Sequence, residues 1–130
     1  MIRAVLALTL TMTVGGQDVP LPGDRQVDAF LTVLGQGKVA EAEAMVTTDP
    51  TYRTEPQDVA ATLPKRAFLD WLGNCRKDLY VNMVFPTLTD GTVTRAFRLE
   101  CRKRGAPASA PYSEKIAFFV SSKGDGIKIY

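Results

Sequence analysis

The chain has 130 residues, of which 45% are hydrophobic and 23% charged, the composition of one ordinary globular domain. Its 16 basic and 14 acidic residues leave a net charge of +2, which does not provide the lopsided basic surface that nucleic-acid binding usually requires. The absence of histidine excludes His-based acid–base catalysis, Ser-His and Cys-His nucleophiles and most catalytic zinc sites. We therefore predict no metal, no cofactor and no nucleic-acid partner.

The N-terminus is typical of an export signal. Arg3 precedes the apolar run AVLALTLTMTV, and Val14 and Gly16 provide small residues at the −3 and −1 positions of a cleavage site. The run is too short to span a bilayer, which takes about 20 apolar residues. We predict a signal peptide over residues 1–16 and a periplasmic or secreted protein without a membrane span. The alternative is a buried first helix or strand.

Two helices are expected next. Residues 17–23 are a Pro/Gly linker, and Asp24 is the predicted N-cap of a helix that ends at the GQG of residues 35–37. Its apolar positions follow the i, i+3, i+4, i+7 pattern of a buried stripe: Val27, Phe30, Leu31 and Leu34. A second helix is predicted over Lys38–Val46 and stops at the TTDP of residues 47–50.

A third helix and a sheet follow. TYRTEP (51–56) is compatible with a short strand, and Thr62 with Pro64 predicts the start of a helix that carries Phe68, Trp71, Leu72 and Cys75. Beyond Cys75 the apolar residues alternate with period two, which predicts strands over 79–86, 92–103, 112–121 and 126–130. The fold class is α+β: a curved, mainly antiparallel sheet of four or more strands wrapped around three helices, in one domain over 24–130.

The hairpin turns allow the strands to be registered. A three-residue loop over Thr89–Gly91, with Gly91 left-handed, places Leu79 opposite Cys101 and Met83 opposite Phe97. Hydrophobic matching then pairs Phe97 with Ile116, Phe118 with Ile129 and Val120 with Ile127. This register gathers the apolar side chains on one face, which we expect the helices to cover.

The same register predicts a disulfide. Cys101 lies opposite Leu79 on the helix-covered face, and Cys75 precedes Leu79 by four residues, so both sulfurs reach the same end of the sheet. A Cys75–Cys101 bond would attach the third helix to the sheet and stabilise the fold by about 3–4 kcal/mol. An export signal and a cysteine pair support each other. The alternative is two buried free thiols.

The order of these elements resembles a known superfamily. Two short helices with FLTVLGQGKVAEAEAMV, a third helix with KRAFLDWLGNC and a curved meander are similar to the nuclear-transport-factor-two-like α+β cone, which includes ketosteroid isomerase and polyketide cyclases. The resemblance covers about residues 24–130 and is greatest to small exported members with a cysteine pair. It implies a pocket between helices and sheet, which serves catalysis in some members and only binding in others.

The candidate pocket residues are Arg95, Glu114, Trp71, Phe85 and Phe118. Arg95 and Glu114 interrupt the apolar face, so one interpretation is that Arg95 holds an acidic ligand at the pocket mouth, with Glu114 as partner or base. The alternative, which their places near the strand ends favour, is that both side chains reach solvent. Trp71 is explained equally by core packing.

Three functions remain open. The first is a non-catalytic domain that binds a small hydrophobic or acidic ligand, or a protein partner. The second is an isomerase or dehydratase of a hydrophobic substrate, using Glu114 or Asp70 with Tyr80 or Tyr112. The third is a structural or accessory domain whose sheet face binds another protein. No catalytic residue can be assigned, because the superfamily's catalytic positions find no match among the apolar inward positions.

The outer face of the sheet is a predicted interaction surface. The register gathers Val84, Ala96, Ala117 and Phe119 there, with Arg98 at the rim. Apolar patches with polar rims are typical of partner surfaces. We predict a homodimer through this face, with Arg98 facing Glu100 of the second copy. The alternative is a scatter of single exposed apolar residues.

Overall fold

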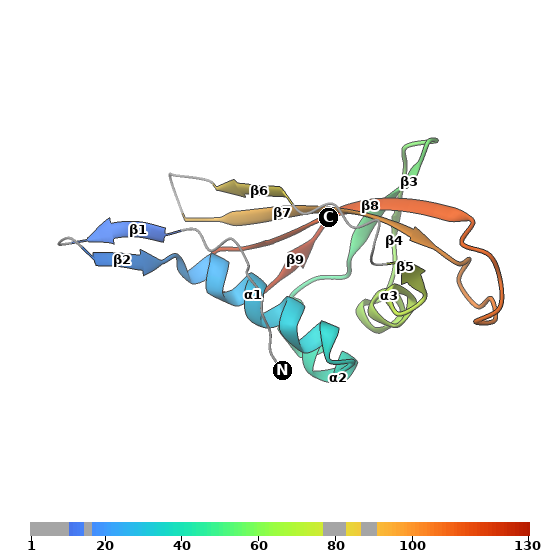
Figure 1. The fold of residues 1–130 in the computed structure, drawn as a ribbon, viewed down its shortest axis with the longest axis horizontal. Coiled ribbons are helices and arrows are strands. Elements are labelled where there is room, and N and C mark those ends of the chain that lie inside the picture. The colour runs from blue at the N-terminus through green and yellow to red at the C-terminus, as the bar shows by residue number, and fades with distance from the viewer. Residues whose placement is uncertain (1–10, 15–16, 77–82, 87–90) are drawn as a thin grey trace.

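A computed structural model describes residues 11–14, 17–76, 83–86 and 91–130 and confirms the α+β fold. Figure 1 shows three helices packed on one face of a sheet. The helices are α1 (Pro22–Gly35), α2 (Val39–Met45) and α3 (Lys65–Leu72). The strands of the sheet are β3 (Thr51–Glu55), β4 (Val59–Thr62), β5 (Cys75–Arg76), β6 (Met83–Pro86), β7 (Val93–Cys101), β8 (Glu114–Ser122) and β9 (Lys128–Ile129).

The long strands β7 and β8 form the centre of this antiparallel sheet, whose order is β4-β3-β8-β7-β5. On the free side of β7, β5 pairs near its end and β6 near its beginning. On the side of β8 away from β7, β3 pairs near the beginning of β8 and β9 pairs near its end. The segment TYRTEP, expected only as a short strand, thus forms β3, next to the central strand β8.

Two short strands precede α1 in the described part of the chain. β1 (Thr11–Val14) and β2 (Gln17–Pro20) form a separate antiparallel ribbon next to the start of α1 (Figure 1). The predicted linker over 17–23 therefore contains a strand and the first helical residues. The signal peptide over residues 1–16 stays a prediction.

The helices begin and end close to the predicted residues, but two predicted caps are wrong. The N-cap of α1 is Leu21, followed by Pro22, whose fixed φ suits the first helical position. Asp24 lies inside the first turn, fully buried. Thr62 belongs to β4, where its hydroxyl hydrogen-bonds that of Thr51, and α3 starts after Pro64.

The core lies between the helices and the sheet. Val27 and Phe30 of α1, Phe68 and Trp71 of α3, and the inward residues of β7 and β8 are almost fully buried. The ring of Phe118 contacts those of Phe68 and Phe97, with centroids 5.3 and 5.4 Å apart. The predicted helix-covered face is correct for β7, β8 and β9.

The predicted pairing of β7, β8 and β9 is shifted by two residues. Phe97 lies opposite Phe118 rather than Ile116, and Val120 lies opposite Ile129 rather than Ile127. A slip of two keeps every side chain on its face, so hydrophobic patterning cannot detect it. The predicted inward and outward residues of these strands are therefore correct despite the shift in pairing.

The pairing of β6 with β7 is shifted by one, which exchanges the faces. Met83 lies opposite Ala96 rather than Phe97, and Val84 lies opposite the inward Arg95. The sequence MVFP is apolar throughout, so alternation does not specify which residues of β6 point inward. Gly91 does have the expected positive φ, of 77°. The predicted pairing of Leu79 with Cys101 is wrong, because Cys75 of β5 lies opposite Cys101.

Candidate apolar cavity

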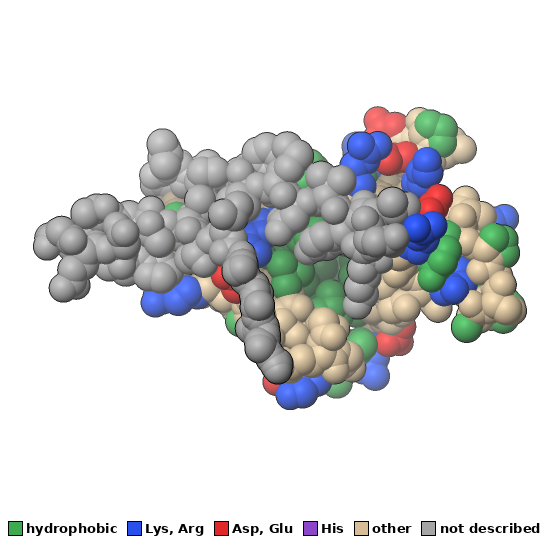
Figure 2. All heavy atoms as spheres, in the orientation of Figure 1, with side chains coloured by type: hydrophobic (Ala, Val, Ile, Leu, Met, Phe, Trp, Pro, Cys, Tyr) green, Lys and Arg blue, Asp and Glu red, His purple; other side chains and the backbone are tan. Residues whose placement is uncertain are grey.

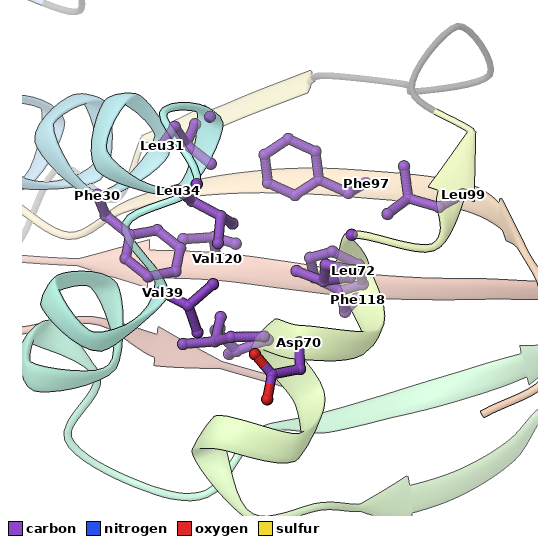
Figure 3. Close-up of a pocket in the computed structure, with 15 residues that line it drawn as sticks. Phe30, Leu31, Leu34, Val39, Asp70, Leu72, Phe97, Leu99, Phe118 and Val120 are labelled. Atoms are coloured by element: carbon purple, nitrogen blue, oxygen red, sulfur yellow. The ribbon is translucent and has the colours of Figure 1, made fainter. Parts of the chain in front are cut away.

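A cavity of about 350 Å³ lies between the three helices and the inner face of the sheet. Figure 3 shows its walls: Leu31 and Leu34 of α1, Val39 of α2, and Phe97 and Phe118 of the sheet surround one space. In Figure 2, hydrophobic side chains gather in a hollow on this side of the molecule. Its described lining is Phe30, Leu31, Leu34, Gly35, Gly37, Val39, Leu69, Asp70, Leu72, Gly73, Phe97, Leu99, Phe118, Val120 and Ile129.

Strand β7 organises this region through its inward residues. Arg95, Phe97, Leu99 and Cys101 alternate along the strand on the side that the helices cover. Arg95 contacts α1 and Cys101 is bonded to Cys75, directly after α3. Phe97 and Leu99, between those two contacts, line the cavity. The cavity therefore lies where the sheet passes between its attachments to two different helices.

The first attachment, which we call the ionic anchor, consists of Arg95, Asp24 and Asp28. The Nη2 atom of Arg95 lies 2.7 Å from Oδ1 of Asp24 and 2.6 Å from Oδ1 of Asp28. The side chains of Arg95 and Asp24 are only 3% and 0% exposed, and that of Asp28 is 31% exposed. A buried charge is tolerated when it is paired in this way.

The ionic anchor corrects both sequence interpretations of Arg95. The side chain does not extend to solvent from a strand end, because it is buried against the first turns of α1. It is also absent from the described lining of the cavity. Since two carboxylates already bind its guanidinium, the geometry gives no support to Arg95 as the holder of an acidic ligand.

The second attachment, which we call the disulfide anchor, is the Cys75–Cys101 bond, and it confirms the predicted pairing. Cys75 lies in β5, directly opposite Cys101, rather than at the end of α3. The indole Nε1 of Trp71 donates a 2.6 Å hydrogen bond to the carbonyl of Arg102, beside the bond. A further hydrogen bond of 3.1 Å runs from the N–H of Arg102 to the carbonyl of Asn74. The disulfide and these two hydrogen bonds hold the segment after α3 to the end of β7.

Among the described lining residues, Asp70 is the one ionisable side chain. It lies at the mouth, with its side chain 59% exposed and 3.5 Å from Nε of Arg66. A general base for a hydrophobic substrate would need to lie inside the cavity, within reach of the reacting proton. A solvated carboxylate with a basic neighbour offers no such group.

The other candidate residues are dispersed. Phe118 lines the cavity, whereas Trp71 packs in the core against Tyr52, with ring centroids 5.2 Å apart. Glu114 lies opposite Cys101 at the start of β8 and is not part of the described lining. Tyr112 stacks under Arg102, whose guanidinium carbon lies 4.2 Å from the ring centre. The side chains of Phe85 and Tyr80 lie outside the described part of the structure.

Sequence reasoning missed the helical walls of the cavity. Leu31 and Leu34 were expected in the buried stripe of α1, but they and Val39 of α2 are only partly buried. The sequence did contain an indication of these walls. The apolar face of α1 includes the adjacent residues Phe30 and Leu31, so it is wider than a single line of contacts with the sheet. The sequence could not show that part of this stripe faces a space rather than another side chain.

Within the described chain, no group of three or more Cys, Asp and Glu residues is placed to hold a metal ion. The helices of the described segments are also too short or too polar to cross a membrane. No protein-family model matches the chain, and no curated protein and no solved structure is significantly similar to it.

Proposed function

We propose that this protein is a non-catalytic binding protein whose cavity takes a small apolar ligand. This proposal rests on the cavity of about 350 Å³, whose described lining is apolar except for Asp70 at the mouth. Ligand cavities in proteins start at about 300 Å³ and are mostly apolar. Each 100 Å² of apolar ligand surface removed from water would contribute about 2.5 kcal/mol before the costs of binding.

The walls of the cavity indicate how a ligand would enter it. Leu31, Leu34 and Val39 are partly exposed and lie where α1 turns into α2, whereas Phe97, Val120 and Ile129 form a nearly fully buried floor. A ligand would enter past the partly exposed residues and rest on the sheet. Its polar part would remain near Asp70, the charged residue at the mouth.

We also propose a superfamily and a cellular location for this protein. Two helices, a β-hairpin, a third helix and a meander support membership of the nuclear-transport-factor-two-like superfamily. The disulfide is typical of an oxidising compartment and supports export to the periplasm or the medium. Mass spectrometry of the protein from its native cells tests the export prediction, because cleavage after Gly16 would remove residues 1–16.

Fluorescence titration with N-phenyl-1-naphthylamine, an uncharged probe that brightens in apolar sites, tests ligand binding. Leu34→Trp would fill the cavity from α1 and is expected to weaken probe binding about tenfold or more. Thr32→Trp is the matched control, because Thr32 is exposed on the same helix and does not line the cavity. Equal binding by both folded variants, or no probe binding to the wild type, would contradict the proposal.

A further inference from the structure

The outer face of the sheet carries an apolar row with two exposed aromatic rings. Phe119 and Tyr130 are 40% and 51% exposed, and their ring centroids lie 5.7 Å apart. Backbone hydrogen bonds pair these two residues, and Ala96 lies on the other side of Phe119. Val84, expected in this patch, lies at an inward register position, opposite Arg95. The observed patch is therefore Ala96, Phe119 and Tyr130, with Ala117 beside it on β8.

Basic residues surround this row. The register places five basic side chains on the outer face of the described strands: Arg53, Arg76, Arg98, Lys115 and Lys128. Only two acidic side chains, Glu55 and Glu100, share that face. Asp58, in the turn after β3, also pairs with Arg53 at 3.0 Å. The face and this turn together therefore carry a net charge of +2, as much as the whole chain. The excess of positive charge is thus concentrated beside the exposed rings.

Both carboxylates of the face are already engaged. Glu55 accepts hydrogen bonds of 3.2 and 3.0 Å from Nε and Nη2 of Arg98. Glu100 lies 3.6 Å from Nη1 of Arg76. In the described part of the chain, neither Lys115 nor Lys128 forms a salt bridge. These two lysines lie on either side of Phe119 along β8 and β9 and offer positive charge to a partner.

We propose that the outer face docks an acidic protein segment that presents an apolar side chain to Phe119 and Tyr130. The rings would supply the apolar contact, and Lys115 and Lys128 would pair with carboxylates of the partner. Two observations weigh against other occupants. A second copy would bring two faces of charge +2 together, and the expected Arg98–Glu100 pair between copies is replaced by pairs within one chain.

Uniform polyanions fit less well than an acidic protein. Glu55 and Glu100 lie in the same row as Lys115, so a nucleic acid or an anionic membrane would place phosphates next to carboxylates. A protein segment can alternate acidic, neutral and apolar residues to match the row.

Binding of a random copolymer of glutamate and tyrosine, measured by fluorescence anisotropy at low salt, tests this inference. We expect poly-glutamate to bind about tenfold more weakly, because it lacks the apolar contact. Phe119→Ala and Lys115→Glu should each weaken copolymer binding about tenfold. Lys103→Glu is the matched control, since Lys103 is exposed in the loop after β7, and its effect should stay below about twofold.

Three results would overturn the inference. The first is equal loss of copolymer binding in Lys115→Glu and Lys103→Glu, or no binding at all. The second is tighter, Phe119-dependent binding of a single-stranded DNA oligonucleotide or of phosphatidylserine vesicles. The third is a wild-type dimer in light scattering that Ala96→Glu converts into a folded monomer, which would assign the face to a second copy. Naphthylamine binding in the cavity should be unchanged in Lys115→Glu and Phe119→Ala.

Discussion

The ionic anchor and the disulfide anchor attach two helices to the same strand by different physics. Arg95 holds α1 through the buried carboxylate of Asp24 and the partly exposed one of Asp28, and Cys101 holds the end of α3 through its bond to Cys75. The ionic contact depends on every buried charge keeping its partner in the folded state. The disulfide acts chiefly by restricting the unfolded chain.

The positions of the two anchors on β7 match the location of the cavity. α1 is attached near one end of β7 and the segment after α3 at the other, and Phe97 and Leu99 line the cavity between the two attachments. The C-terminal half of α1, with Leu31 and Leu34, lines the space. Well-defined attachment at both ends therefore coexists with an opening between them.

The largest expected effect comes from Arg95→Met. Removing the guanidinium leaves Asp24 buried without its partner, which should lower the free energy of unfolding by about 3–5 kcal/mol in urea denaturation. The double variant Arg95→Met/Asp24→Leu removes both buried charges and should recover most of that loss. If the double variant is as unstable as Arg95→Met, lost packing rather than the unpaired charge is responsible.

Breaking the disulfide anchor should have a somewhat smaller effect. Cys75 and Cys101 are 26 residues apart, and closing such a loop in the unfolded chain accounts for about 3–4 kcal/mol. Cys75→Ala/Cys101→Ala and the dithiothreitol-reduced wild type should both lose this amount in urea denaturation. The comparison fails if reduced and oxidised proteins unfold at the same urea concentration.

The smallest effects concern the two ends of α1. A Cβ at Gly23 would clash with the backbone carbonyl of Ser122, so Gly23→Ala should cost about 1–3 kcal/mol. At Gly35 nothing lies within 4 Å, so Gly35→Ala should gain about 0.5–1 kcal/mol from helix propensity. Thermal unfolding followed by circular dichroism measures both. Equal effects of the two substitutions would show that the two ends of α1 are packed alike.

Much of the fold follows from the sequence alone. The apolar spacing of α1 and the alternation of β7 and β8 are local patterns, and each specifies its element without reference to the rest of the chain. The positions of Cys75 and Cys101 at the same end of the sheet were sufficient to predict their bond. The cavity residue Phe118 was also predicted, because its inward position depends only on the parity of β8.

Only the tertiary structure decided the role of Arg95. Its partners, Asp24 and Asp28, precede it by about 70 residues, and no local pattern links an acid in the first turn of a helix to a base in a distant strand. Asp24 therefore resembled a helix cap, and Arg95 resembled a residue that reaches solvent. Burial makes this ion pair an attachment between α1 and β7, because a charge removed from water is costly unless an opposite charge pairs with it.

The sequence by itself determined which elements form and which faces of β7, β8 and β9 turn inward, since those depend on periodicity. The tertiary structure decided the face of β6, the insertion of β3 beside β8 and the cavity between the two anchors. The uniformly apolar β6 carries no alternation to fix its face. A cavity is space left by side chains from several elements, so its presence depends on their packing in three dimensions rather than on any one segment.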